Sequence, residues 1–140
     1  MKEITKVVVD AMGGDNAPHE IIKGAVEAVG KSDAIHVILV GKEDVINQEL
    51  SGYTYNKEQI SVVHTSEVIE TAELPVMAIR RKKDSSIVVG LKMVKDKEAD
   101  AFVSAGSSGA VLAGGQLLVG RIKGVERPPL APLIPTEKGF

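Results

Sequence analysis

The chain has 140 residues, of which 44% are hydrophobic and only 3% aromatic, so it can build one domain with an aliphatic core. Its 17 basic and 19 acidic residues give a net charge of −2, and it contains no cysteine. These values exclude a strongly basic nucleic-acid surface with aromatic stacking platforms, disulfides and thiolate metal sites.

No apolar segment approaches the length of a membrane span, and the run 7–9 is too short for a signal peptide. We therefore expect a soluble, cytoplasmic protein. The absence of cysteine is compatible with a reducing compartment but does not prove one.

The first half of the chain alternates apolar, β-branched runs with stretches of helical periodicity. We expect strands at 4–9, 35–40 and 60–63. We expect helices at 18–30, where Pro18 suits the first turn and Gly30 the end, and at 42–50.

The second half has a helical stretch at 72–83 around Pro75, followed by a helix capped by Ser85 or Ser86. A strand at 101–104 and a small-residue-rich helix at 110–122 complete the pattern. The tail, 127–140, holds four of the six prolines and offers no closing element. We expect residues 1–140 to form a single α/β domain that is the N-terminal part of a longer polypeptide, with a mostly parallel sheet covered by helices on both faces.

The stretch "DAMGGDNAP" follows the first strand, where open α/β sheets bind their ligands. Gly13 and Gly14 permit positive φ and a close approach of backbone to ligand, and the following helix start suits an anion. Asp10 and Asp15 oppose a bare anion and suit hydroxyl groups, a cation or the orientation of basic side chains. The alternative is a tight turn in which Asp15 or Asn16 caps the helix. The glycine spacing matches neither a dinucleotide fingerprint nor a P-loop.

A second loop of this kind, "VSAGSSGA", also follows a strand and opens a helix. It offers N–H and hydroxyl donors to phosphate oxygens from Ser104, Gly106, Ser107, Ser108 and Gly109. The alternative is an ordinary serine-capped helix start. Two such loops at equivalent strand ends favour anion binding.

The stretch "IRRKKDSS" contains the densest positive charge in the chain, at 80–83, and then Ser85 and Ser86 at a helix start. Arginine holds phosphate through two parallel hydrogen bonds, whereas lysine acts as a compact charge. Four consecutive residues cannot all face one site, so we expect one or two to bind the anion. The alternative is a solvated helix end whose cations offset the helix dipole.

The three histidines, at positions 19, 36 and 64, have no metal-ligand spacing, and we interpret each as structural. We expect no metal and no cofactor. No serine–histidine–aspartate triad is indicated by the spacing, and neither loop has the nucleophile-elbow pattern.

Four blocks in the same order resemble the PlsX family of phosphate acyltransferases of bacterial glycerolipid synthesis. They are "VVVDAMGGDNAP", "IRRKKDSS" with its Pro75 lead-in, "ADAFVSAGSSGAVLA" and "ERPPLAPLIPT". The resemblance spans essentially the whole chain, but family members are about twice as long or more. Where many relatives carry "GNTG", this chain has "GSSG" at 106–109, which keeps hydrogen-bonding groups and weakens any role for an amide side chain at position 107.

The resemblance implies transfer of a fatty acyl group from acyl carrier protein to inorganic phosphate, giving acyl phosphate for phospholipid synthesis. It implies a three-layer α/β sandwich related to phosphotransacetylases and to isocitrate and isopropylmalate dehydrogenases. It also implies a homodimer that associates peripherally with the membrane, through a segment outside these 140 residues.

For this reaction we expect Arg80 or Lys83 and the loop 104–109 to grip the phosphate, with Asp10 and Asp15 orienting the cations or the loop. Asn16 and the two serines at 85 and 86 complete the candidate binding set. Phosphate is already a competent nucleophile, so no covalent intermediate is needed. Two alternatives stay open: a phosphotransacetylase-like enzyme using coenzyme A thioesters, and a non-catalytic anion-binding or oligomerisation module.

Overall fold

The computed structural model describes residues 4–139, in which strands and helices alternate along the chain. The strands are β1 (Thr5–Asp10), β2 (Ile35–Gly41), β3 (Ile60–His64) and β4 (Ala101–Val103). The α-helices are α1 (His19–Lys31), α2 (Glu43–Leu50), α3 (Pro75–Arg81), α4 (Ser86–Lys95) and α5 (Ser108–Gly114). A 3-10 turn, η1 (Lys57–Gln59), precedes β3, and a π-helical turn, η2 (Gly115–Val119), continues α5.

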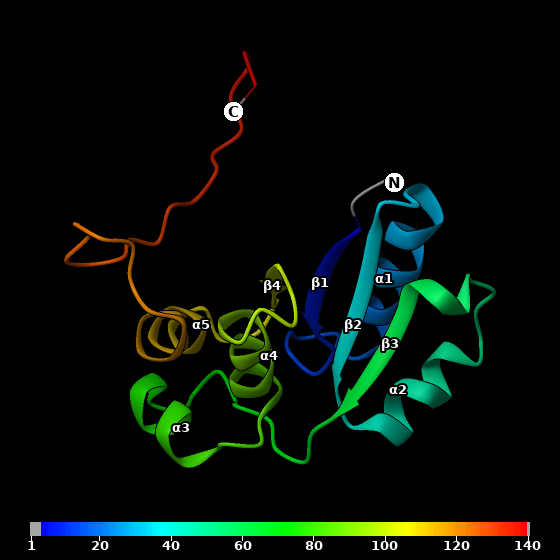
Figure 1. The fold of residues 1–140 in the computed structure, drawn as a ribbon, viewed down its shortest axis with the longest axis horizontal. Helices are drawn as coiled ribbons and strands as arrows, with labels where there is room; N and C mark the ends of the chain where they lie inside the picture. Colours follow the sequence, from blue (N-terminus) through cyan, green and yellow to red (C-terminus); the bar gives the residue numbers. More distant parts are fainter. Residues whose placement is uncertain (1–3, 140) are drawn as a thin grey trace.

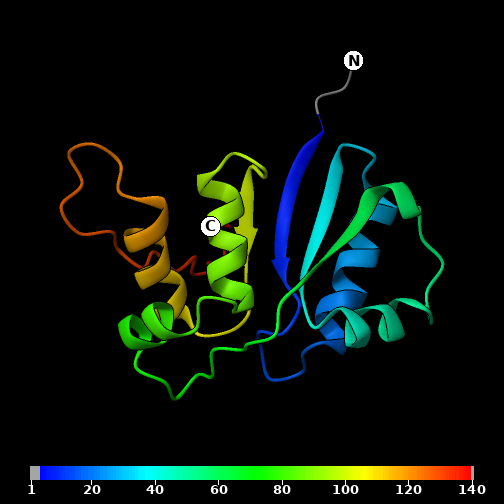
Figure 2. The same cartoon turned by 60° about the horizontal axis from the view of Figure 1, so that its bottom comes forward.

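The four strands form one parallel sheet in the order β3-β2-β1-β4. The chain moves outward from β1 to β2 and β3, and then returns through α3 and α4 to place β4 on the other side of β1. Figure 2 shows the carboxyl ends of the strands and the starts of α1, α4 and α5 at the bottom of the molecule. The direction of winding reverses between β1 and β4, and such a switch point is where open parallel sheets leave a ligand crevice.

Helices cover both faces of the sheet, as the alternation of the buried strand residues requires. In β2, Val37 and Leu39 point into the cluster formed with α1 and α2, which includes Ile22. The intervening Ile38 and Val40 point into the cluster with β1 and α4. Because both faces are buried, the strand reads as a continuous apolar run rather than an alternating one.

A third cluster joins α3, α4 and α5, so α3 and α5 lie outside α4 on one side of the sheet (Figure 1). Its buried members include Ile79, Ile87 and Leu91. The structure thus confirms an α/β sandwich of three layers with a parallel sheet.

Two helices have boundaries that differ from the predicted ones for local reasons. The helix predicted from residue 72 begins at Pro75, whose fixed φ and missing N–H suit the first helical position. The helix predicted at 110–122 begins earlier, because Ser107 caps it by accepting a hydrogen bond from the N–H of Ala110 at 3.2 Å. It ends earlier as well, after η2, at Gly120 with φ 103°.

Residues 120–139 follow η2 without a helix or a strand and are almost all exposed. In Figure 1 this segment leaves the end of the α5–η2 helix and extends away from the sheet. No helix within residues 4–139 is long and apolar enough to cross a membrane.

Candidate anion-binding site

The carboxylate of Asp10 joins the two glycine-rich loops at the switch point. Asp10 ends β1 and is only 1% exposed. Its Oδ2 accepts a hydrogen bond from Ser104 Oγ at 2.7 Å, and its Oδ1 accepts one from the N–H of Met12 at 3.1 Å. Ser104 Oγ in turn accepts a hydrogen bond from the N–H of Gly106 at 3.0 Å. One buried carboxylate therefore organises the loop after β1 and the loop after β4.

The backbones of the two loops are in contact, and glycine makes this contact possible. A Cβ on Gly13 would lie 2.3 Å from Asp10 Oδ2 and 2.9 Å from Ser104 Oγ. A Cβ on Gly106 would lie 3.1 Å from the Cα of Gly13. Gly14 has φ 116°, which confirms the predicted need for a left-handed residue in this turn. A side chain at Gly13 or Gly106 would push the loops apart.

The serine-rich loop ends at the start of α5 and packs against the start of α3. A Cβ on Gly109 would lie 2.8 Å from Pro75 Cγ. Ser107 is 6% exposed and serves as the cap of α5, so its side chain is engaged within the loop. Ser108 is exposed. This loop therefore presents both backbone N–H groups and one exposed hydroxyl near the crevice.

Asp15 and Asn16 lie at the exposed rim of the first loop. Neither caps α1: Pro18 occupies the cap position, and no side chain there accepts a hydrogen bond from the helix. The alternative is therefore borne out in its tight turn, in which the N–H of Ala17 donates to the carbonyl of Gly14 at 3.2 Å, but not in its side-chain cap. The first helical residue is His19, one position after the proline.

The four basic residues at 80–83 divide into different environments. Lys82 is half-buried, pairs with the carboxylate of Glu73 and donates to the carbonyl of Val68 at 2.6 Å. The hydrogen bond from Lys82 lowers the pKa of Glu73. Lys82 therefore has a structural role that sequence reasoning did not assign.

Arg80 and Lys83 are exposed near the end of α3. Lys83 Nζ lies 3.5 Å from the carbonyl oxygen of Ile79 in its own helix. Among residues 4–139, no side-chain hydrogen bond joins either of the two to a glycine-rich loop. The structure therefore does not bring these two cations into contact with the loops, although Figure 2 shows α3 at the same end of the molecule as the carboxyl ends of the strands.

The two serines at the start of α4 are buried, and Ser85 is confirmed as the cap. Ser85 Oγ donates to the carbonyl of Lys82 at 2.8 Å and accepts from the N–H of Val88 at 3.4 Å. Ser85 is 0% exposed and Ser86 is 1% exposed. The Ser85 hydroxyl thus holds the helix start together, and any contact with a ligand requires rearrangement there.

A clamp that the sequence did not reveal, formed by Ser66, Glu67 and Asp84, joins the segment after β3 to the start of α4. The Asp84 carboxylate accepts hydrogen bonds from both the N–H, at 2.8 Å, and the hydroxyl of Ser66. Glu67 Oε2 accepts the N–H of Asp84 at 3.0 Å. The hydrogen bonds from Ser66 lower the pKa of Asp84. The sequence pointed to this clamp only through the position of Asp84, directly before the capping residue Ser85.

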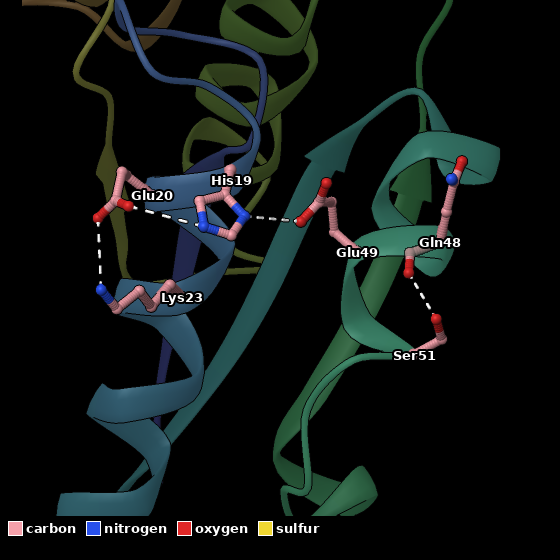
Figure 3. Close-up of polar contacts among 6 residues, drawn as sticks. All are labelled: His19, Glu20, Lys23, Gln48, Glu49 and Ser51. Carbon is pink, nitrogen blue, oxygen red and sulfur yellow. Dashed lines mark hydrogen bonds and ion pairs between the residues drawn. The ribbon is translucent and has the colours of Figure 1, made fainter.

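The histidines make structural contacts, as Figure 3 illustrates for the first of them. His19 Nδ1 lies 3.0 Å from Glu49 Oε2, which links the start of α1 to the end of α2. Its Nε2 lies 3.7 Å from Glu20, which also pairs with Lys23. His36 contacts Ser61 Oγ, and His64 accepts the N–H of Glu43. Within the described part of the chain, no group of three histidine, aspartate or glutamate side chains is arranged to hold a metal ion.

These features define a class: a three-layer α/β protein in which two glycine-rich loops meet at the carboxyl edge of a parallel sheet, the edge where such sheets bind their ligands. The family model described as "Fatty acid synthesis protein" matches residues 5–140. The chain belongs to this family.

Curated relatives give a more specific comparison. The chain is 60% identical over 135 residues to a protein of Alkaliphilus oremlandii named phosphate acyltransferase, covering 96% of this chain and 40% of the relative. It is 57% identical over 134 residues to the protein of that name from Clostridium novyi, with the same coverage. It is 51% identical over 134 residues to the one from Thermoanaerobacter pseudethanolicus, covering 96% and 39%. The chain thus spans about two fifths of the length of the curated relatives it matches, and the resemblance found in the four motifs is confirmed.

Proposed function

We propose that the protein carrying this chain transfers a fatty acyl group from acyl carrier protein to inorganic phosphate, forming an acyl phosphate for phospholipid synthesis. The observation that carries the proposal is the junction of the two glycine-rich loops at the switch point through Asp10 and Ser104. The names of the relatives support the coarser part of the proposal, transfer of an acyl group to phosphate.

The reaction requires the site to hold phosphate beside the thioester carbonyl and to stabilise the oxyanion that develops. An oxygen of hydrogen phosphate attacks the carbonyl carbon, forming a C–O bond. The C–S bond then breaks, and the proton of the phosphate leaves with the thiolate as the free thiol of the carrier. No group on the protein needs to form a covalent bond to the substrate.

In this proposal the donors to phosphate are the N–H groups of Gly13 and Gly14, the N–H groups of 107–109 and the hydroxyl of Ser108, while the Gly106 N–H holds the loop through Ser104. Asp10 acts as a positioning residue, because its buried carboxylate is occupied by the loops. Its negative charge is offset by those hydrogen bonds, so it fixes the donors without facing the ligand.

The exposed cations Arg80 and Lys83 supply positive charge to the phosphate from the side of α3. Asp15 and Asn16 lie at the rim of the first loop and orient these cations or the loop 104–109. Ser85 and Ser86 shape the start of α4 behind the site.

We further propose that residues 1–140 are the N-terminal α/β domain of a longer, homodimeric, cytoplasmic protein that associates peripherally with the membrane. The lengths of the relatives support the first part of this proposal. The ends of the range, residues 1–3 and 140, lie outside the described residues.

The test is an assay of acyl phosphate formation from inorganic phosphate and either palmitoyl-acyl carrier protein or palmitoyl-coenzyme A, with the protein that carries this chain. The proposal expects a higher kcat/KM for the carrier protein thioester. A preference for coenzyme A would favour a phosphotransacetylase-like enzyme instead. No acyl phosphate from either donor would favour a non-catalytic anion-binding or oligomerisation module.

A further inference from the structure

An apolar groove lies where α3 contacts the α5–η2 helix, and Figure 2 shows α3 lying across the start of that helix. The groove has a volume of about 350 Å³, within the ~300–1,000 Å³ typical of small-molecule sites. Its apolar lining consists of Pro75, Val76, Gly109, Leu112, Ala113 and Leu117. Gln116 is the single polar side chain on it, and no charged residue lines it.

One end of the groove belongs to the proposed phosphate site. Gly109 is both the last glycine of the serine-rich loop and a lining residue of the groove. A Cβ added at Gly109 would lie only 2.8 Å from Pro75 Cγ, so the loop and the wall of the groove are in close contact at this position. From Gly109 to Leu117 the helix rises about 12 Å, so the groove leads away from the loop along α5.

Three of the apolar side chains along the groove are exposed. Val76 is 44%, Leu112 36% and Leu117 49% exposed. Leu112 and Gln116 also line a second, apolar hollow of about 510 Å³ on the other side of α5. A continuous apolar surface that begins at a polar loop suits a ligand with a reactive polar head and a long apolar tail.

We propose that this groove holds the hydrocarbon chain of the acyl group, with its carbonyl carbon at the serine-rich loop, and so sets the preference for chain length. The proposal rests on the proposed function for the identity of the reaction. Burial of each methylene against the groove favours long chains over short ones, because the gain grows with apolar area. Leu112 and Leu117 are then specificity-determining residues, distant from the bond that breaks.

The test compares palmitoyl and butyryl thioesters of acyl carrier protein in the protein carrying this chain, with the double variant Leu112→Gln, Leu117→Gln. The matched control is Ile4→Gln, which changes another exposed aliphatic residue, 56% exposed, next to the amino end of β1. We expect the double variant to lower the palmitoyl-to-butyryl ratio of kcat/KM about tenfold, with the KM for phosphate unchanged. Ile4→Gln should leave the ratio as it was. An equal loss with both thioesters would overturn the proposal.

A second measurement separates this proposal from the proposed function. Binding of the fluorescent fatty acid cis-parinaric acid to the protein that carries this chain, with displacement by palmitate, needs no turnover. The parent protein could make no acyl phosphate and yet bind cis-parinaric acid, as Ile4→Gln does, while the double variant does not bind it. In that case the proposed reaction is wrong, and the proposal that the groove binds a hydrocarbon chain is upheld. Equal binding by all three proteins would overturn the groove. So would a double variant that changes the oligomeric state in size-exclusion chromatography with the chain-length ratio unchanged, since the groove would then be a contact between copies.

Discussion

Ser104 Oγ donates a 2.7 Å hydrogen bond to Asp10 Oδ2 across 94 positions of sequence. Asp10 is the last residue of β1 and Ser104 directly follows β4, and the two strands pair in parallel register. This bond, rather than either loop alone, brings the backbone N–H groups of two loops to one edge of the sheet.

Replacing Ser104 by alanine should destabilise the fold. The change removes a hydrogen bond to a buried carboxylate, and such bonds contribute about 1.5–3 kcal/mol. Urea unfolding followed by circular dichroism measures the loss. Ser108→Ala, in the same loop but exposed, should change the free energy of unfolding by less than about 0.5 kcal/mol. Equal stability of the two variants would mean that the Asp10–Ser104 bond does not hold the loops.

Replacing Gly13 by alanine should destabilise the chain by about 1–3 kcal/mol, because the new Cβ overlaps Asp10 Oδ2. Gly24→Ala is the matched control. Gly24 lies within α1, where an added Cβ would meet no heavy atom within 4 Å, and alanine there should stabilise the helix by about 0.5–1 kcal/mol. Thermal unfolding of both variants gives the comparison. A Gly13→Ala variant as stable as the parent would contradict the contact between the loops.

Replacing Thr65 by valine should stabilise the fold by about 1 kcal/mol. Thr65 is 0% exposed, and its Oγ1 has no hydrogen-bond partner within residues 4–139. A buried hydroxyl without a partner costs free energy that a methyl group of similar size does not. Thr5→Val, at an exposed strand position, should have little effect. A destabilised Thr65→Val variant would show that the hydroxyl is satisfied.

Protonation of Asp84 should account for part of the decrease in the free energy of unfolding at acid pH. The hydrogen bonds from Ser66 hold its pKa below the ordinary value of 3.8, so its contribution is present above that value and is lost as the pH falls through the folded-state pKa. Ser66→Ala should raise the pKa of Asp84 and reduce the difference in unfolding free energy between about pH 6 and pH 3. In Ser51→Ala, which removes a hydroxyl bonded to a backbone carbonyl, the pH dependence should match the parent. The same pH dependence in Ser66→Ala would contradict the role of the clamp.

Periodicity and turn chemistry predicted most of the fold. The β-branched runs before Asp10 and Gly41 predicted buried parallel strands, because such strands are apolar on both faces. Pro75 and the serine at 85 marked helix starts through well-understood backbone preferences. The early end of α5 was not predictable from composition, because small residues are compatible with a longer helix and the termination depends on the left-handed conformation of Gly120.

The site was predictable in part. The two glycine-rich loops were identified because each follows a strand and precedes a helix. Their mutual contact depends on the strand order, which places β4 beside β1, and sequence periodicity does not determine that order. The separation of Lys82 from its basic neighbours depends on where Glu73 lies in the folded chain. The clamp between Ser66 and Asp84 has the same origin.

If the two loops form one oxyanion site, inorganic phosphate must perturb the backbone amides of both loops, and a phosphate titration of the ¹⁵N-labelled chain measures this. At constant ionic strength, with chloride as the reference anion, we predict saturable amide shifts at Gly13 and Gly14 and at residues 106–109, with one common Kd. Ser104→Ala should weaken that Kd for both loops together. Shifts that do not saturate, or saturable shifts confined to other parts of the chain, would contradict the account.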